Sequence, residues 1–298
     1  MSGLAFSVSP SHGGALATFE DAYDAPIPGG GSQYVYRRVD RRNAADKREV
    51  PHVLCLGHGS FASTLDCVRI LGGVRTPVAI KQIALDKRAA EAAGSGEQRG
   101  LSTLAGRAHP CIVRYLAFFQ ADEGGGRVRL SFVFERCPVA APFLLAATHN
   151  AKGQVVPGDD AAQGEREGAD LMNNPIARAP LALVEAVYVV KQLLSAIAYL
   201  HAANIVHRDI KPENTLVWGV SRGAGGERLL HVKITDYGTM RTAMAGEGLT
   251  VGSGTRNFMA PEVDAVTGVA GKERKEVASY DGGADVFSVG ATFFFLVR

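Results

Sequence analysis

The segment at residues 207–214 carries residue types that could combine acid–base chemistry with metal binding. It reads HRDIKPEN and directly follows a long apolar stretch. The carboxylate of Asp209 can accept the proton of a substrate hydroxyl, and the side chain of Asn214 can hold a metal ion. Lys211 stands two residues after Asp209, where its ammonium can neutralise charge on a phosphoryl group during transfer. We therefore take Asp209 and Lys211 as candidate catalytic residues and Asn214 as a candidate metal ligand.

A second candidate metal ligand and a closing motif follow on the C-terminal side. Residues 233–238 read KITDYG, so Asp236 comes after a short apolar run and before a glycine. This position suits a second magnesium ligand. Residues 254–262 read GTRNFMAPE and close the segment that begins at Asp236.

Two segments nearer the N-terminus could bind phosphate groups. Residues 57–62 read GHGSFA, and glycines let backbone N–H groups approach phosphate oxygens closely. Considered alone, this pattern more often marks a hairpin turn. Residues 78–81 read VAIK, and Lys81 could place its ammonium on nucleotide phosphates, although alone it reads as an exposed strand lysine. In the phosphate-binding role Lys81 needs an acidic partner, for which Glu97 is our choice and Glu91 the alternative.

From about residue 53 the chain reads as a small, mostly antiparallel sheet with one helix. The helix is expected within residues 86–106, where four glycines weaken it. The strands are short apolar runs bounded by glycine-containing turns. They are expected at residues 53–56, 65–70, 78–81, 112–119 and 128–134.

The clearest helix is predicted directly before the HRDIKPEN segment, over residues 183–203. Its apolar residues recur at spacings of three and four, which is typical of a helix with one buried face. That face is expected to comprise Val187, Val190, Leu194, Ile197 and Leu200. A second helix is predicted from Asp285 to the end of the chain.

Two segments are rich in small residues, glycine and proline. Residues 1–48 read as a disordered leader, and residues 146–180 read as an insert that is either disordered or regulatory. A basic cluster lies near the end of the leader, and we interpret it as solvated rather than as a binding patch. The cluster comprises Arg37, Arg38, Arg41, Arg42, Lys47 and Arg48.

The composition favours a globular protein without nucleic-acid or membrane partners. The 298 residues are 46% hydrophobic and the net charge is +2, so there is material for a core but no overall attraction to polyanions. The four cysteines show no metal-binding spacing and read as packed thiols of an intracellular protein. We expect a cytoplasmic location, with the nucleus as the alternative.

The glycine loop, VAIK, HRD…N, DYG and APE segments occur in the order of the eukaryotic protein kinase superfamily, and the chain resembles its serine/threonine members over residues 50 to 298. The resemblance implies an α+β, two-lobed fold within residues 49–298. A small antiparallel sheet would form the N-lobe (49–135), and the insert (146–180) would precede a mainly helical C-lobe (181–298). This C-lobe is expected to be incomplete, because Arg298 falls inside the helix that contains Asp285.

The resemblance also implies ATP and Mg²⁺ as cofactors, with Asn214 and Asp236 as metal ligands and Lys81–Glu97 as a catalytic ion pair. Phe134 resembles the gatekeeper, and residues 135–137 resemble the hinge whose backbone holds adenine. The implied nucleotide-binding residues are Gly57, Gly59, Ser60, Phe61, Ala79, Lys81, Glu135, Cys137 and Leu216.

Further residues resemble the internal supports of this family. Asp285 would anchor the catalytic loop, Thr255 would orient it, and Arg208 would pair with a phosphate added by an upstream kinase at Thr250 or Ser253. The apolar spine would comprise Leu101, Tyr115, His207 and Tyr237.

Three positions depart from the family pattern. Ala62 replaces the third glycine, Thr64 stands where valine usually caps adenine, and Tyr237 replaces a phenylalanine, so its hydroxyl needs a partner. The implied function is a serine/threonine protein kinase that transfers the γ-phosphate of ATP to protein hydroxyls. The alternatives are an ATP-binding but catalytically impaired fragment that acts as a scaffold, and a non-enzymatic interaction fragment.

Overall fold

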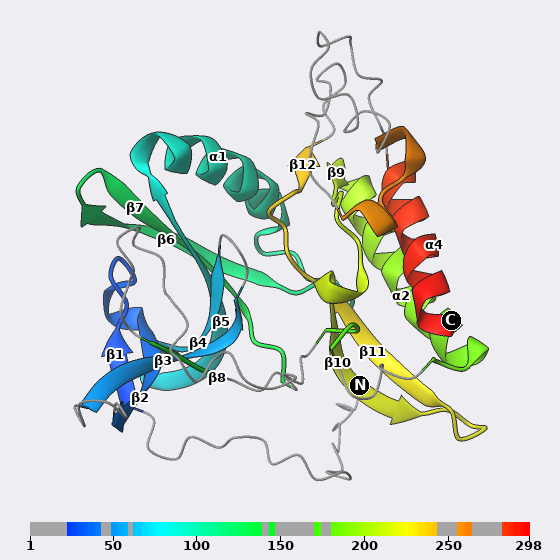
Figure 1. Cartoon of the computed structure of the whole chain (residues 1–298), viewed down its shortest axis with the longest axis horizontal. Helices are drawn as coiled ribbons and strands as arrows, with labels where there is room; N and C mark the ends of the chain where they lie inside the picture. Colours follow the sequence, from blue (N-terminus) through cyan, green and yellow to red (C-terminus); the bar gives the residue numbers. More distant parts are fainter. Residues whose placement is uncertain are drawn as a thin grey trace, which may run out of the picture. The chain divides into compact units, whose positions relative to one another are not determined.

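The computed structural model describes residues 23–42, 49–58, 62–138, 143–146, 170–173, 180–242, 255–263 and 282–298 (Figure 1). The chain divides into two compact units. The sheet unit holds the described parts of Ser11–Ser95 and Arg114–Arg166. The helical unit holds Gly96–Val113 and the described part of Glu167–Arg298.

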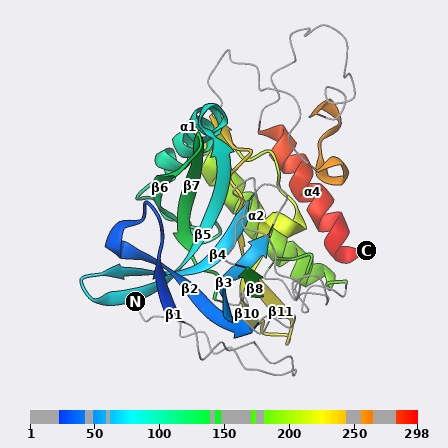
Figure 2. The same ribbon diagram turned by 60° about the vertical axis from the view of Figure 1, so that its left-hand side comes forward.

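The sheet unit is built on an eight-stranded antiparallel sheet with the order β1-β2-β3-β4-β5-β7-β6, in which β8 also pairs with β3 (Figure 2). Helix α1 (Lys87–Leu104) follows β5, and the division between the two units falls within it, after Ser95. These strands and this helix confirm the antiparallel sheet with one helix expected from the sequence. The strands are β1 (Tyr23–Pro26), β2 (Tyr34–Arg42), β3 (Glu49–His58), β4 (Ser63–Leu71), β5 (Val74–Asp86), β6 (Tyr115–Gly124), β7 (Arg127–Glu135) and β8 (Phe143–Ala146).

The turn between β4 and β5 shows why glycine is needed there. Gly72 and Gly73 have φ angles of 55° and 78°. Two consecutive positive φ angles match the twist of a two-residue hairpin and favour glycine over residues with a side chain.

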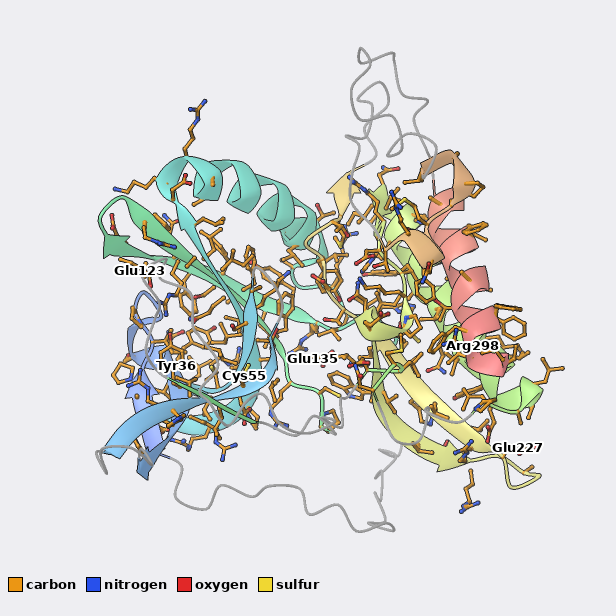
Figure 3. The ribbon with its side chains drawn as sticks, in the orientation of Figure 1. Tyr36, Cys55, Glu123, Glu135, Glu227 and Arg298 are labelled. Atoms are coloured by element: carbon orange, nitrogen blue, oxygen red, sulfur yellow. The ribbon has the colours of Figure 1, made fainter. Side chains whose placement is uncertain are left out.

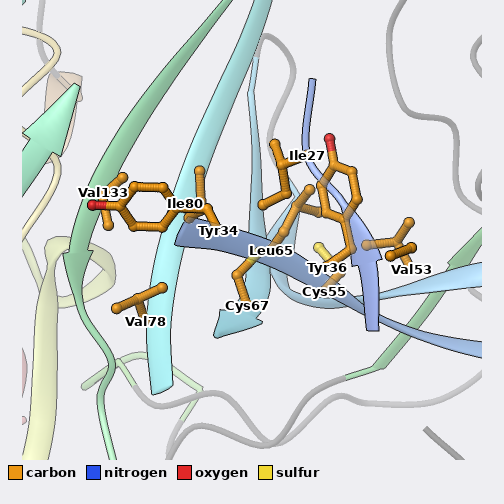
Figure 4. Close-up of a cluster of buried hydrophobic side chains, with 11 residues drawn as sticks. Ile27, Tyr34, Tyr36, Val53, Cys55, Leu65, Cys67, Val78, Ile80 and Val133 are labelled. Atoms are coloured by element: carbon orange, nitrogen blue, oxygen red, sulfur yellow. The ribbon is translucent and has the colours of Figure 1, made fainter. Parts of the chain in front are cut away.

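The expectation of a disordered leader over residues 1–48 is wrong for the described residues 23–42. β2 pairs with β3 through Arg38–Arg42 and with β4 through Tyr34–Tyr36. The physical reason is apolar burial, because Ile27, Tyr34 and Tyr36 belong to one buried cluster with residues of β3, β4, β5 and β7 (Figure 4). The glycine- and proline-rich stretch at 26–32 only forms the turn between β1 and β2.

The helical unit contains two long helices and short strand pairs. Helix α2 (Leu183–Ala202) packs against β11 and against helix α4 (Gly283–Val297). The expected helices at 183–203 and from Asp285 onward are thereby confirmed. The strand pairs are β9 (Ile205–Val206) with β12 (Arg241–Thr242) and β10 (Thr215–Arg222) with β11 (Arg228–Ile234).

The face of α2 that is buried differs from the expected one. Val187 and Leu194 are 37% and 41% exposed, so the prediction that they are buried is wrong. Apolar residues surround most of this helix, and the positions of β11 and α4 decide which of them become core. The buried apolar residues are Ala186, Val189, Leu193, Ala196, Ile197 and Leu200.

Among the described residues, α2 is also the one helix whose length and composition would allow it to cross a membrane. Its packing against β11 and α4 is that of a core helix in a globular unit.

The insert also differs from expectation at one place, the described residues 170–173. The side chain of Leu171 is fully buried, and its N–H donates to the carbonyls of Pro212 at 3.1 Å and Thr215 at 2.9 Å. These four residues are therefore packed beside the HRDIKPEN segment rather than disordered. The other insert residues after Ala146, apart from Pro180, lie outside the described residues.

Candidate active site

A buried carboxylate on α4 holds the start of the HRDIKPEN segment. Asp285 is completely buried, and its two oxygens accept hydrogen bonds from the backbone N–H groups of His207 at 2.9 Å and Arg208 at 2.8 Å. His201 Nε2 lies 2.9 Å from Asp285 Oδ2. Through these hydrogen bonds Asp285 anchors the start of the HRDIKPEN segment, as the resemblance implied.

These bonds also explain the ionisation of Asp285. Burial by itself would raise the pKa of Asp285, but the hydrogen bond from His201, the charge of His207 and the two backbone N–H groups outweigh burial. Together they hold this pKa below its ordinary value. The anchor is thus a carboxylate at neutral pH.

Two residues of this region have left-handed backbone conformations that side chains rarely adopt. The φ angle is 74° at Arg208 and 63° at Asp236. Such strain persists only where the surrounding contacts determine the backbone, and it is concentrated at functional sites. The bond from Arg208 N–H to Asp285 is one such contact.

The carboxylate of Asp209 is fixed by three side chains from two segments. Asn214 Nδ2 donates to the backbone carbonyl of Asp209 and to its Oδ2, both at 2.8 Å. Lys211 Nζ lies 2.9 Å from Asp209 Oδ2 and donates to Thr255 Oγ1 at 2.6 Å. Thr255 donates to Asp209 Oδ1 through its N–H at 3.2 Å and its hydroxyl at 3.3 Å. The structure therefore brings Asp209, Lys211 and Asn214 together and shows that Thr255 contacts the HRDIKPEN segment.

The DYG segment is tied to the same loop through the backbone. Thr235 N–H donates to the carbonyl of Asn214 at 2.9 Å, and His207 Nε2 lies 3.1 Å from the carbonyl oxygen of Thr235. Thr239 Oγ1 donates to the carbonyl of His207 at 2.8 Å. Asn214 and Asp236, the two candidate metal ligands, therefore lie on segments that are hydrogen-bonded to one another.

These two candidate ligands would suit a magnesium ion that takes the rest of its coordination shell from water and phosphate oxygens. Among the described residues, no group of three or more His, Cys, Asp or Glu side chains is arranged to hold a metal. Mg²⁺ commonly takes one or two protein ligands and completes its shell with water and substrate phosphates. Asn214 donates with its Nδ2 atom, which leaves its amide oxygen for a cation.

The tyrosine of the DYG segment has the hydrogen-bond partners that its hydroxyl requires. Tyr237 is buried, and its OH donates to the carbonyls of Val113 at 2.7 Å and Ile234 at 3.0 Å. Its ring meets the ring of His207 edge-on at 5.9 Å between centroids. Two of the four predicted spine residues are thus in contact, and a third, Leu101, is buried in the same unit.

In the sheet unit, the strand register places the candidate nucleotide-binding residues Lys81 and Ala79 on the same face of the sheet. Lys81 is paired with Thr64 and Phe132, and Ala79 is paired with Asp66 and Phe134. Paired residues of antiparallel strands share a face, and neighbours along a strand point to opposite faces. The alternate residues Leu65, Cys67, Val78, Ile80 and Val133 fill the buried cluster on the other face.

The segment after β7 is held by its own contacts. The N–H of Glu135, which is labelled in Figure 3, donates to the carbonyl of Arg114 at 3.0 Å, and the N–H of Arg114 donates to Glu135 Oε1 at 2.8 Å. Arg136 Nη1 donates to the carbonyl of Cys137 at 3.2 Å. Phe134 is buried, and its ring lies 5.9 Å from that of Tyr115, the fourth predicted spine residue.

Several predicted site residues lie outside the described part of the chain. Gly57 is paired with Thr64 at the end of β3, whereas Gly59, Ser60 and Phe61 are not described. The backbone of Glu97 belongs to α1, but its side chain is not described, so the Lys81–Glu97 pair stays a prediction. Leu216 is half-buried on β10. The predicted phosphorylation positions Thr250 and Ser253 also lie outside the described residues.

Sequence reasoning missed two site residues that the structure supplies. His201 lies at the C-terminal end of α2 and contacts Asp285, a pairing across 84 residues that no local pattern indicates. Asp66 is an almost completely buried carboxylate on β4. An acidic residue within an apolar strand was the available signal for Asp66.

Comparison with known proteins agrees with this site. The family model described as "Protein kinase domain" matches residues 52–298. The match covers most of the chain, so the chain belongs to the protein kinase domain family.

Curated relatives show which members of the family are similar. The meiosis-specific serine/threonine-protein kinase mek1 of Schizosaccharomyces pombe is 28% identical over 44% of this chain and 28% of its own length. Myosin light chain kinase A of Dictyostelium discoideum is 32% identical over 44% of this chain and 38% of its own length. CBL-interacting protein kinase 20 of Oryza sativa subsp. japonica is 29% identical over 81% of this chain and 43% of its own length. The chain thus spans less than half the length of each of these relatives.

Proposed function

We propose that this chain is a serine/threonine protein kinase that transfers the γ-phosphate of ATP to serine or threonine hydroxyls of protein substrates. The observation that carries the proposal is the network in which Asn214, Lys211 and Thr255 fix the carboxylate of Asp209. A carboxylate held in one orientation can accept the proton of an incoming hydroxyl in a defined geometry. The names of mek1 and the other relatives support the same class of activity.

Each residue of the network has a separate task in this proposal. Asp209 positions the substrate hydroxyl and takes its proton as the hydroxyl oxygen bonds to the γ-phosphorus, while the bond from this phosphorus to the β,γ-bridging oxygen breaks and ADP leaves. Lys211, 2.9 Å from Asp209, offsets negative charge on the phosphoryl group in transit. Asn214 and Asp236 would hold Mg²⁺, which supplies charge neutralisation at the phosphate oxygens when it is bound.

Lys81 and the residues after β7 would bind the nucleotide. Lys81 shares a face of the sheet with Ala79 and Phe134, so its ammonium can reach phosphates while the adenine lies over Ala79. The backbone of Glu135 and Cys137 would hydrogen-bond the adenine edge. We place the activity in the cytoplasm, with the nucleus as the alternative.

The test is phosphate transfer by the purified chain from radiolabelled ATP to a generic serine/threonine substrate, in the presence of Mg²⁺. Asp209→Asn should abolish transfer while leaving ATP binding intact. Asp122→Asn is the matched control, because Asp122 is an exposed carboxylate of the sheet unit paired with Lys87. Binding of ATP without transfer by the wild type would instead support the impaired scaffold, and absence of ATP binding would contradict both.

A further inference from the structure

A buried carboxylate in the sheet unit joins two arginines that are distant in the sequence. Asp66 on β4 is 1% exposed. Its Oδ2 accepts a hydrogen bond from Arg37 Nη1 on β2 at 2.9 Å, and its Oδ1 accepts one from Arg136 Nε at 2.6 Å. Arg136 is the middle residue of the hinge segment 135–137. Through one carboxylate, β2 is therefore connected to the hinge.

We propose that β2 is a built-in positioning element for the hinge, acting through Arg37, Asp66 and Arg136, and that it thereby tunes nucleotide affinity. The part concerning nucleotide rests on the proposed function. The connection from β2 to the hinge stands on the hydrogen bonds alone.

The register of the sheet places this triad beside the proposed adenine position. Tyr36 is paired with Cys67, and both belong to the buried cluster. Their neighbours Arg37 and Asp66 consequently point to the opposite face. Asp66 is itself paired with Ala79, over which the adenine would lie. The triad thus occupies the nucleotide-binding face of the sheet and not its core face.

Arg136 links its ion pair with Asp66 to the backbone of the next residue, Cys137. Its Nε donates to Asp66 while its Nη1 donates to the carbonyl of Cys137 at 3.2 Å. A guanidinium is planar, so holding one edge fixes the direction of the other. The orientation of the Cys137 peptide group therefore depends on where Asp66 holds Arg136.

Arg37 determines how firmly Asp66 holds the guanidinium of Arg136. A carboxylate that is almost completely buried needs charged or hydrogen-bonding partners on its oxygens. Without Arg37, the carboxylate would be drawn toward its remaining guanidinium and toward water, and Arg136 would follow.

Arg37 also precedes the matched family region, which begins at residue 52. The positioning element is thus an addition to the matched domain.

The experiment compares two arginines that tie the same N-terminal hairpin to the sheet. Arg37→Gln removes one bond to Asp66. Arg75→Gln is the matched control, because Arg75 pairs with Asp24 on β1 at 2.6 Å and does not contact the triad. Hydrogen exchange of the full chain, without nucleotide, is measured at the amides of residues 135–137 and of β1 and β2.

Arg37→Gln should accelerate exchange at residues 135–137 by about fivefold or more, while Arg75→Gln should leave these amides unchanged. Arg37→Lys should recover part of the protection, since it restores the charge but not the fork geometry. Unchanged hinge exchange in Arg37→Gln would overturn the proposal. So would equal acceleration across β1, β2 and the hinge in both variants, because that pattern indicates general destabilisation.

Nucleotide binding then separates this inference from the proposed function. Arg37→Gln should weaken binding of both adenosine and Mg·ATP by about fivefold, because the adenine contact is affected, and Arg75→Gln should bind like the wild type. If the wild type binds no nucleotide but its hinge exchange responds to Arg37→Gln, the proposed function fails and the positioning element stands. If the wild type binds nucleotide and both variants bind equally well, the role of β2 in affinity is refuted.

Discussion

Each unit contains a buried aspartate that fixes segments within that unit, and the two aspartates accept hydrogen bonds from different kinds of donors. Asp285 in the helical unit accepts two backbone N–H groups from consecutive residues, His207 and Arg208. Asp66 in the sheet unit accepts two guanidinium groups, from Arg37 and Arg136. A backbone donor cannot be moved without moving the chain, whereas an arginine side chain can rotate away. Asp285 therefore fixes the start of the HRDIKPEN segment, and Asp66 forms an adjustable connection between β2 and the segment that follows β7.

The largest expected effect is the loss of unfolding free energy when Asp285 is replaced, which should exceed the loss when Asp66 is replaced. Asp285→Ala would leave two backbone N–H groups buried without their acceptor and should lower the free energy of unfolding by about 3 to 5 kcal/mol. Asp66→Ala should cost less, about 2 kcal/mol, because the side chain of Arg37 is 34% exposed and can turn to water. Urea unfolding measures both values.

The single tryptophan allows unfolding of the helical unit to be followed separately from that of the sheet unit. Trp218 lies on β10, so its fluorescence reports the helical unit, while hydrogen exchange at β4 and β5 reports the sheet unit. Asp285→Ala should shift the fluorescence transition, and Asp66→Ala should mainly change exchange in the sheet. Equal shifts of the fluorescence transition by both variants would contradict the distinction.

The contrast between Asp285 and Asp66 also shows which parts of the site could be predicted from the sequence. Lys211 and Asn214 stand within five positions of Asp209, and their residue types match a known motif order, so their grouping could be predicted before the structure. Asp285 was reached by the same resemblance. The Asp66 triad joins residues separated by 29 and 70 positions, and only strand register brings them together.

The errors have the same physical origin. The segment containing β1 and β2 was interpreted as disordered because of its glycines and prolines. The contrary signal was the run Tyr34-Val35-Tyr36, because aromatic and β-branched residues favour a strand. On α2, apolar residues occupy more than one face, so periodicity could not determine which face β11 and α4 would cover. In both cases tertiary contacts decided between local alternatives.

A smaller effect is expected at Tyr237, which joins the DYG segment to the chain near Val113. Tyr237→Phe removes hydrogen bonds of 2.7 and 3.0 Å from a fully buried hydroxyl while keeping the ring. The free energy of unfolding should fall by about 1 kcal/mol, measured by the fluorescence of Trp218. Tyr188→Phe is the control, because its hydroxyl makes only a 3.4 Å contact with His231 and is less buried. A loss at Tyr237 no greater than that at Tyr188 would show that the hydroxyl adds nothing to the ring.

The smallest expected effect is a pH dependence of the helical unit. Burial lowers the pKa of both His109 and His231 below the ordinary value. A group whose pKa is depressed in the folded state adds stability above its unfolded pKa, and this stability is lost as pH falls through the folded pKa. The pKa of Asp285 is lowered from an already acidic value, so Asp285 does not titrate in this interval. The fluorescence melting temperature should therefore decline between pH 7 and pH 5, by about 2 degrees for each 1 kcal/mol lost.

The control replaces the two titrating rings by neutral groups of similar shape. In His109→Asn an amide oxygen can still accept the N–H of Cys111, which His109 Nδ1 accepts at 3.2 Å. In His231→Gln the side chain can still reach Ser221, whose hydroxyl lies 2.8 Å from His231 Nε2. The double variant should be less stable at pH 7 but show a flatter profile down to pH 5. A decline as steep as that of the wild type would mean that protonation elsewhere drives the change, and the helical unit would then owe none of its acid sensitivity to these two histidines.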